Sequence, residues 1–293
     1  MKLEIVVTLR QDKDMTRLCI LTPDPAYPER WTRDADLYRA LFGDDLAFRP
    51  WIEPGDLSAF SLVMPLIVWG YPLQTARWFA ALDAWEAAGL ALANPVTTLR
   101  WNTNKDYLID LAEQGLAIVP TQLSTSLDAA DLDAAREAFG GGDIVIKPTI
   151  SAGAYGTYRL GPNDPIPFDV IEREMLIQPM MPSIESEGEF SLFYFGGAFS
   201  HAILKKPAAG DFRVQEQFGG REGAVMAPPS ARVLAEAAIA AAPGPLLYAR
   251  VDMVRGSDGE FALMELELIE PSLFLHMAAD SGQAFARAVS AKP

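Results

Sequence analysis

Strand-like and helix-like segments alternate through the first hundred residues of this 293-residue chain, and the alternation limits the folds open to it. Because a strand–helix–strand order favours a parallel sheet covered by helices, we expect a parallel α/β layer here. Pro65 weakens the strand expected at 60–70, since proline cannot donate a ladder hydrogen bond. The expected strands are 3–9 (at the sheet edge), 17–22, 46–51, 60–70 and 90–95, and the expected helices are 33–42 and 73–88.

Beyond Asn104 the pattern changes, and strands dominate the last third of the chain. Gly196–Gly197 and the turn at 256–259 each predict an antiparallel hairpin. We therefore predict an α/β (α+β) fold in three parts: an N-terminal parallel α/β domain (1–100), a small lid subdomain (101–180) and a C-terminal subdomain with an antiparallel sheet (181–293). The expected helices are 104–114, 127–138, 168–174, 230–241 and 283–290, and the expected strands are 117–120, 143–149, 175–180, 188–197, 198–207, 246–254 and 261–269.

The charge balance is strongly acidic, with 24 Lys and Arg against 39 Asp and Glu, a formal net charge of −15. This balance argues against a nucleic-acid or acidic-membrane partner, although a local basic pocket for a small anion remains compatible with it. No apolar run reaches eighteen residues, and the first residues lack a signal-peptide pattern. The single cysteine, Cys19, lies in an apolar run and suits a buried thiol. We expect a cytoplasmic protein.

Carboxylates interrupt the otherwise apolar segment MELELIEPSLF (264–274). Glu265 and Glu267 share one face of the expected strand, roughly 6.7 Å apart. Across the hairpin, Asp252 can join them, and three hard oxygen ligands suit Mg²⁺. The alternative is a half-exposed strand face whose glutamates are solvated or paired with Arg250. If these carboxylates are buried, a metal ion or a basic side chain must neutralise them.

Lysines stand beside two of the small-residue segments. Lys147 ends an apolar strand before the loop ISAGAYGTY (150–158), where an ammonium group and backbone N–H groups can hold a phosphate. Lys105 opens a helix after WNTN. Neither segment matches a P-loop or a dinucleotide fingerprint, and surface positions are the alternative for both lysines. Lys205 and Lys206 precede GDFRVQEQFGG, in which Arg213 and Gln215 alternate before a double glycine; a basic strand edge is the alternative there.

The segment MLIQPMMPSIESEGE (175–189) interrupts a strand with prolines. Gln178 and the backbone after it can bind a purine edge, and Glu189 can accept hydrogen bonds from ribose hydroxyls. The alternative interpretation is that this segment is an interdomain linker. One segment can be a linker and bind a purine at the same time. His201 and His276 lack metal-ligand spacing and are interpreted as structural.

In chain order these segments resemble the ATP-grasp superfamily of carboxylate–amine ligases, from about residue 90 to 275, most sharply at GDFRVQ and in the glutathione synthetase-like and ribosomal-protein glutamate ligase branch. The resemblance implies an ATP-grasp fold, ATP as the phosphoryl donor, Mg²⁺ (or Mn²⁺), and small-molecule carboxylate and amine substrates. It implies metal binding by Asp252, Glu265 and Glu267. It implies nucleotide binding by Lys105, Lys147, Ser151, Gly153, Gln178, Pro179, Met180, Glu189 and Gln215, and catalytic roles for Lys206, Arg213 and Arg250.

Two departures from the family pattern bear on the substrate. Glu267 stands where the family often has asparagine, and Ser191 stands where peptide-ligase relatives often have arginine. The ELELIEPSLF ending resembles D-cycloserine synthetase-like cyclo-ligases instead. The predicted function is ATP-dependent C–N bond formation through an acyl phosphate on a small amino-acid-like substrate. A non-catalytic ATP-binding regulatory module and a peptide- or protein-tagging ligase are the alternatives, and a homodimer is left open.

Overall fold

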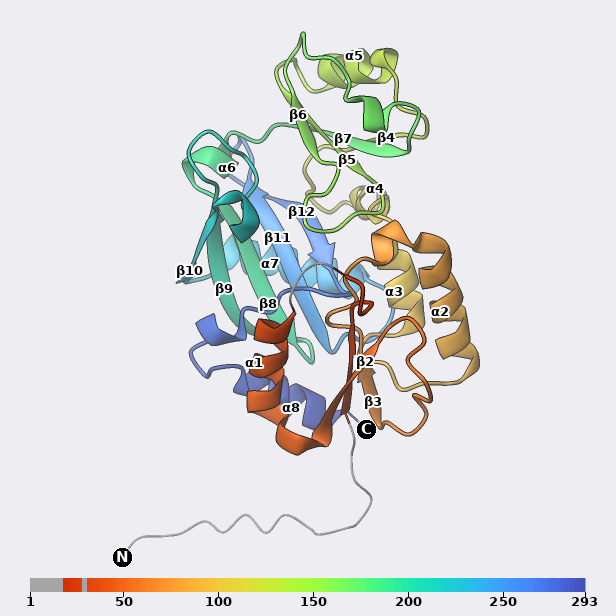
Figure 1. Cartoon of the computed structure of the whole chain (residues 1–293). Coiled ribbons are helices and arrows are strands. Elements are labelled where there is room, and N and C mark those ends of the chain that lie inside the picture. Colours follow the sequence, from red (N-terminus) through yellow and green to blue (C-terminus); the bar gives the residue numbers. More distant parts are fainter. Residues whose placement is uncertain (1–17, 28–30, 293) are drawn as a thin grey trace, which may run out of the picture.

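The computed structural model describes residues 18–27 and 31–292, and contains three sheets. The first is a parallel layer with strand order β2-β1-β3, as the alternating pattern predicts (Figure 1). Pro65 ends β3 early, and the expected strand at 90–95 is reduced to a single bridge between Leu92 and Val63. The expected strand at 3–9 lies outside the described residues. The elements are β1 (Leu18–Thr22), α1 (Thr32–Phe42), β2 (Leu46–Pro50), β3 (Leu62–Met64) and α2 (Thr75–Ala87).

A second sheet of four antiparallel strands, in the order β4-β7-β5-β6, stands at the top of Figure 1 beneath helix α5. Asp128 and Asp131 form a capping box that fixes the start of α5. The expected helix at 168–174 is a single 3-10 turn, Phe168–Val170, and the expected strand at 117–120 is only a bridge at Ile118. The elements are β4 (Gln122–Ser124), α5 (Ala129–Ala138), β5 (Ile144–Pro148), β6 (Tyr158–Leu160) and β7 (Met175–Pro179).

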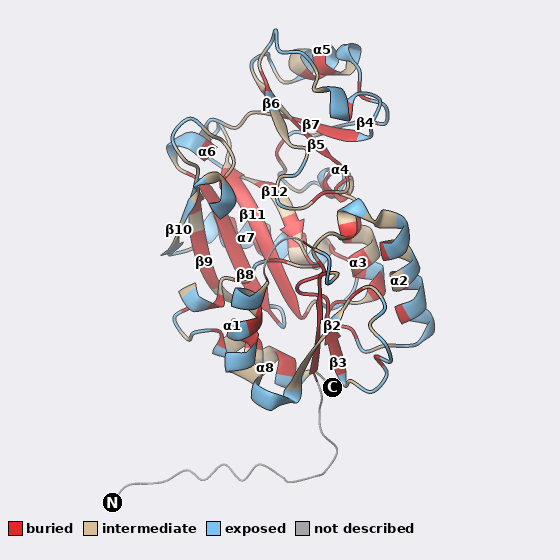
Figure 2. Ribbon diagram, viewed as in Figure 1, coloured by how far each residue is buried: buried red, intermediate tan, exposed pale blue. Residues whose placement is uncertain are grey.

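The third sheet has five antiparallel strands in the order β10-β9-β8-β11-β12, and it forms the buried centre of the molecule (Figure 2). Helix α7 packs against one face through Ala231, Ala235 and Ala238. The parallel layer and α8 cover the other face, where Phe285 is fully buried. The elements are α6 (Ser183–Ser186), β8 (Glu189–Phe195), β9 (Ala198–Lys206), β10 (Arg221–Val225), α7 (Pro229–Ala241), β11 (Tyr248–Arg255), β12 (Phe261–Glu267) and α8 (Gln283–Ala291).

Side chains from two helices complete the outer edge of β12, where an open strand edge would leave backbone groups unpaired. These helices are α3 (Val96–Thr103), which the sequence pattern missed, and α4 (Tyr107–Glu113). The Asn102 amide donates to the Leu266 carbonyl (2.6 Å) and its oxygen accepts from the Leu268 N–H (2.9 Å). The Tyr107 hydroxyl accepts from the Leu266 N–H at 2.8 Å. This edge therefore fixes the strand that carries Glu265 and Glu267.

Within the described ranges, no helix is both long and apolar enough to cross a membrane.

Candidate active site

The two antiparallel sheets and the helices and loops of the parallel layer line one cavity of about 730 Å³, a size typical of small-molecule sites, which span about 300–1,000 Å³. Residues of the parallel layer, the β5–β6 loop, β8, β9, β11 and β12 line it. Of the fifteen residues implied by the sequence, thirteen line the cavity, and Met180 and Lys206 do not.

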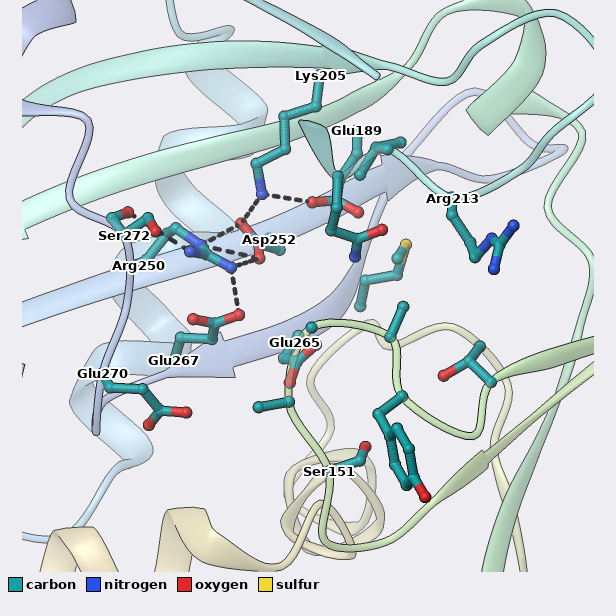
Figure 3. Close-up of a pocket in the computed structure, with 18 of the residues that line it drawn as sticks. Ser151, Glu189, Lys205, Arg213, Arg250, Asp252, Glu265, Glu267, Glu270 and Ser272 are labelled. Atoms are coloured by element: carbon teal, nitrogen blue, oxygen red, sulfur yellow. Dashed lines mark hydrogen bonds and ion pairs between the residues drawn. The ribbon is translucent and has the colours of Figure 1, made fainter. Parts of the chain in front are cut away.

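The acidic wall of the cavity is formed by β11 and β12. Asp252 pairs with Glu265 across the two antiparallel strands, and Arg250 pairs with Glu267. The Arg250 guanidinium donates to both oxygens of Asp252, at 3.1 Å to Oδ1 and at 3.0 Å and 2.9 Å to Oδ2, and it also donates to Glu267 (Figure 3). Asp252 and Glu265 therefore lie on one wall, as the metal-site hypothesis predicts. Glu267 is paired with Arg250, as the alternative interpretation predicts.

Burial and neighbouring charges divide these carboxyl groups into two kinds. Burial opposes ionisation of Asp252 and Glu265, but Arg250 and Lys205 beside Asp252, and Lys105 beside Glu265, hold both pKa values below the ordinary range. Burial raises the pKa of Glu267 to about 7 against the pull of Arg250. Burial and the nearby Glu267 raise the pKa of Glu270 to about 8.

The acidic wall offers the hard oxygen donors that Mg²⁺ prefers. In the described part of the chain, however, no group of three or more His, Cys, Asp or Glu side chains converges closely enough to hold a metal ion. Asp252 and Glu267 are held by Arg250, and Glu265 by Lys105 at 3.2 Å. Carboxylate oxygens are donors of the type that binds magnesium. To hold the metal, the three carboxylates need to release Arg250 and Lys105.

Lys105 and Lys147 place two cations opposite the acidic wall. The Lys105 backbone N–H donates to Thr149 at 2.8 Å, and its ammonium donates to the Ser151 carbonyl, so Lys105 is tied to the β5–β6 loop. Lys147 is buried on β5 and lines the same cavity. Burial lowers its pKa, and Glu265 opposes this effect. Neither lysine is the surface residue that the alternative interpretation requires.

The loop after β5 closes one side of the cavity. Gly153 and Gly156 have positive φ (61° and 67°), which favours glycine. A Cβ on Gly156 would lie 2.9 Å from the Pro148 side chain, so this turn packs against the strand end. Across the cavity mouth, Gln217 Nε2 donates to the Gly153 carbonyl at 3.3 Å.

The lysine that enters the cavity from β9 is Lys205, and the prediction of Lys206 was wrong in position. Neighbouring residues of a strand face opposite sides, so only one of the two can point inward. Lys205 is buried and lies 2.9 Å from Glu189 and 3.5 Å from Asp252, whereas Lys206 is exposed. Burial and Arg250 oppose its charge, but Asp252 and Glu189 leave the pKa of Lys205 above its ordinary value.

The segment expected to hold a purine has mixed outcomes. Gln178 and Pro179 line the cavity, and the Gln178 amide donates to Thr121 Oγ1 at 2.8 Å. Met180 is not part of the lining: its backbone N–H donates to Asp143 at 2.9 Å, because β7 stays paired beside the start of β5. Glu189 lies in the cavity wall, with its carboxylate on Lys205.

The loop 211–220 brings Arg213 and Gln215 to the cavity. Arg213 is held by Asp211 at 2.8 Å and lies over the Phe218 ring at 3.7 Å. The Oε1 atom of Gln215 is buried, and no residue that the structure describes donates a hydrogen bond to it, an arrangement that a ligand donor would complete. The second glycine of the pair that ends this loop packs against the loop itself, since a Cβ on Gly220 would lie 2.0 Å from the Val214 carbonyl.

His201 is structural, as expected. It stacks on Phe193 with ring centroids 4.3 Å apart, and its Nε2 lies 3.1 Å from the Leu273 carbonyl. His276 lines the cavity rim. The sequence missed Tyr71, which lines the cavity from the parallel layer, because an aromatic residue in an apolar run is more often a core residue.

Comparison with known proteins identifies the class. No family model matches the chain. The cycloserine biosynthesis protein DcsG of Streptomyces lavendulae is 32% identical over 256 residues, covering 80% of this chain and 84% of that protein. The glutathione synthetase of Ralstonia nicotianae is 27% identical over 259 residues, covering 83% and 74%.

Structural comparison agrees. The crystal structure of D-cycloserine synthetase DcsG superposes with a TM-score of 0.81 at 27% identity, covering 93% of this chain and 98% of that one. The chain therefore belongs to the ATP-grasp ligases and is an ATP-dependent carboxylate–amine ligase. Within that class it is a homologue of DcsG.

Proposed function

We propose that this ligase transfers the γ-phosphoryl group of ATP to a small amino-acid-like carboxylate and so forms an acyl phosphate. An amine-type nitrogen of the same molecule then attacks the acyl carbon and displaces phosphate, as in a D-cycloserine synthetase-type cyclo-ligase. The single observation that supports it best is the opposition of two walls in one cavity. Lys105 and Lys147 face a wall that carries Asp252, Glu265 and Glu267. Such a pair of walls suits a triphosphate and the cations that accompany it.

Each side chain has a proposed part in this reaction. Lys105 and Lys147 hold phosphate oxygens, while Gln178 and Pro179 border the purine. Asp252, Glu265 and Glu267 hold Mg²⁺, which would neutralise phosphate charge when bound. The further groups proposed at the nucleotide are Ser151, Gly153, Glu189 and Gln215, and those proposed at the reacting carboxylate are Arg213 and Arg250.

Charge exchange explains how a site with paired carboxylates accepts a metal. In the structure Arg250 and Lys105 neutralise the acidic wall. Both are also cations that an incoming carboxylate or phosphate can attract. We propose that substrate anions draw these cations away and leave the carboxylates to the metal. Water must also be excluded because it hydrolyses an acyl phosphate, and the loop 150–157 is the proposed lid.

A non-catalytic ATP-binding module has less support, because a pure binder has no use for Arg213 and Lys205 beside the acidic wall. A peptide-tagging ligase needs an open groove for a polypeptide.

The test is ATP-dependent phosphate release with a panel of amino acids and ureido amino acids, followed by mass spectrometry of the product. The proposal predicts phosphate release that needs Mg²⁺, and a product that has lost the elements of water or of a small leaving group. Replacing Lys147 by alanine should abolish release, whereas Lys206→Ala, which changes the exposed neighbour of Lys205, should not. ATP binding without turnover of any panel member would favour the non-catalytic module.

A further inference from the structure

Glu270 differs from the other carboxylates of the acidic wall. Asp252, Glu265, Glu267 and Glu189 each contact a lysine or arginine. Within the described residues, Glu270 has no hydrogen bond or ion pair, although it is partly buried and lines the cavity. Figure 3 shows its side chain beside Glu267 with no interaction drawn to it.

Tyr71 is a second polar group without a partner at the same end of the cavity. Its side chain is only 3% exposed and packs on Trp78, with ring centroids 4.8 Å apart. No residue of the described ranges hydrogen-bonds to its hydroxyl group, and Tyr71 lines the cavity. Buried polar groups are normally satisfied, so an unpaired carboxylate and an unpaired phenol at one cavity end indicate a missing ligand group.

The two groups lie near one another, although they come from different parts of the fold. Tyr71 packs in the same buried cluster as Ile269, the residue before Glu270, and both Tyr71 and Glu270 line the cavity. In agreement with this proximity, the charge of Glu270 raises the pKa of Tyr71. Tyr71 lies in the 3-10 turn Tyr71–Leu73 of the parallel layer, and Glu270 follows the end of β12. The parallel layer and the acidic wall therefore meet at this end of the cavity.

The chemistry of this pair selects its ligand. With a pKa of about 8, Glu270 is largely protonated at neutral pH in the empty cavity, and a cation beside it would lower this pKa and hold the group as a carboxylate. A carboxylate accepts hydrogen bonds from such a cation, and the phenol can accept one further hydrogen bond. Phosphate and carboxylate groups are repelled here, since Glu267 and Glu265 lie close by. An ammonium group satisfies both partners at once and adds a positive charge to an acidic corner.

We propose that Glu270 and Tyr71 form the subsite for the ammonium group of the amino-acid substrate, and so select amino acids over simple carboxylic acids. This inference rests on the proposed function and specifies the substrate class of the same cavity. A bound ammonium group at this end would direct the rest of the substrate toward Arg250, whose guanidinium also contacts the Ser272 carbonyl at 3.4 Å.

The experiment compares phosphate release by the full-length protein with acids that keep the attacking nitrogen and differ only in the α-amino group: the D and L forms of the best ureido amino acid against its deamino counterpart. Four proteins are used: wild type, Glu270→Gln, Tyr71→Phe and the control Glu113→Gln, which changes an exposed glutamate on α4. KM for ATP and the Mg²⁺ concentration at half-saturation are measured for each.

Wild type should discriminate against the acids that lack the amino group. In Glu270→Gln, KM for the amino acid should rise about thirtyfold or more, and the discrimination should shrink accordingly. Tyr71→Phe should raise KM about fivefold, the effect of one neutral hydrogen bond. KM for ATP and the Mg²⁺ requirement should change by less than twofold in both variants, and Glu113→Gln should behave as wild type.

The failures are distinguishable. Equal use of amino and deamino acids by wild type, or unchanged discrimination in Glu270→Gln, would overturn the ammonium subsite while leaving the ligase intact. A raised Mg²⁺ requirement in Glu270→Gln, with KM for the amino acid unchanged, would make Glu270 a metal ligand instead. Absence of phosphate release with every acid, despite ATP binding, would overturn the proposed function itself.

Discussion

Replacing Asn102 by alanine tests whether side chains from α3 hold the strand that carries the acidic wall. The substitution removes the acceptor for the Leu268 N–H and leaves this buried group without a partner, whereas the Leu266 carbonyl loses one donor and keeps the Tyr107 hydroxyl at 3.0 Å. An orphaned buried polar group costs about 1–3 kcal/mol, and the expected loss of unfolding free energy is of that size.

This loss converts into a measurable shift. Unfolding entropies near 2.1 cal/mol/K per residue give roughly 0.6 kcal/mol/K for a chain of this length, so the melting temperature should fall by about 2–5 °C. Scanning calorimetry measures it directly. Asn163→Ala is the control, because Asn163 is exposed and should shift the melting temperature by less than about 1 °C. A shift below 1 °C for Asn102→Ala would refute the view that this edge depends on the asparagine.

Three further predictions concern the cavity walls. Lys205→Met should destabilise the protein by about 3–5 kcal/mol in thermal unfolding, because it leaves the buried Glu189 without its lysine and removes one of the two cations beside Asp252. Lys206→Met should change stability by less than about 0.5 kcal/mol; equal effects would contradict the assignment of Lys205 as the buried lysine. Gly220→Ala should destabilise the loop 211–220 and make it more susceptible to limited proteolysis, since its Cβ meets the Val214 carbonyl; an unchanged digestion rate would count against that contact. Because the pKa of Glu270 is raised to about 8, the folded state binds more protons than the unfolded state between about pH 4.5 and 8. Stability should therefore fall as pH rises through this window, and Glu270→Gln should melt above wild type at pH 9 but not at pH 4; identical melting at both pH values would contradict the shift.

The order of strands and helices was largely predictable from sequence, because it depends on local patterns. Alternation gave the parallel layer, and the glycine pair after Phe195 gave the β8–β9 hairpin. Helix α3 was missed because its sequence, VTTLRWNT, is rich in β-branched and polar residues that gain helix stability only from packing, as at the buried Leu99.

The site was predictable where it depends on residue type and strand period, and not where it depends on side-chain direction. Asp252 and Glu265 face each other because antiparallel pairing across a short turn fixes their register. The choice between Lys205 and Lys206 depends on which face of β9 is buried, and two adjacent lysines carry no information about that. Tyr71 joins the cavity through packing of the parallel layer against β12, a contact between segments about two hundred residues apart.

The most direct test of the account is calorimetric titration of the protein with ATP in the presence of Mg²⁺, comparing wild type with Lys147→Ala and Lys206→Ala. If a buried cation on β5 holds the triphosphate, wild type and Lys206→Ala should bind with closely similar affinity, and Lys147→Ala should bind at least about thirtyfold more weakly. Equal affinity in all three proteins would mean that the nucleotide binds elsewhere. It would contradict a site in which Lys105 and Lys147 hold the triphosphate opposite the acidic wall.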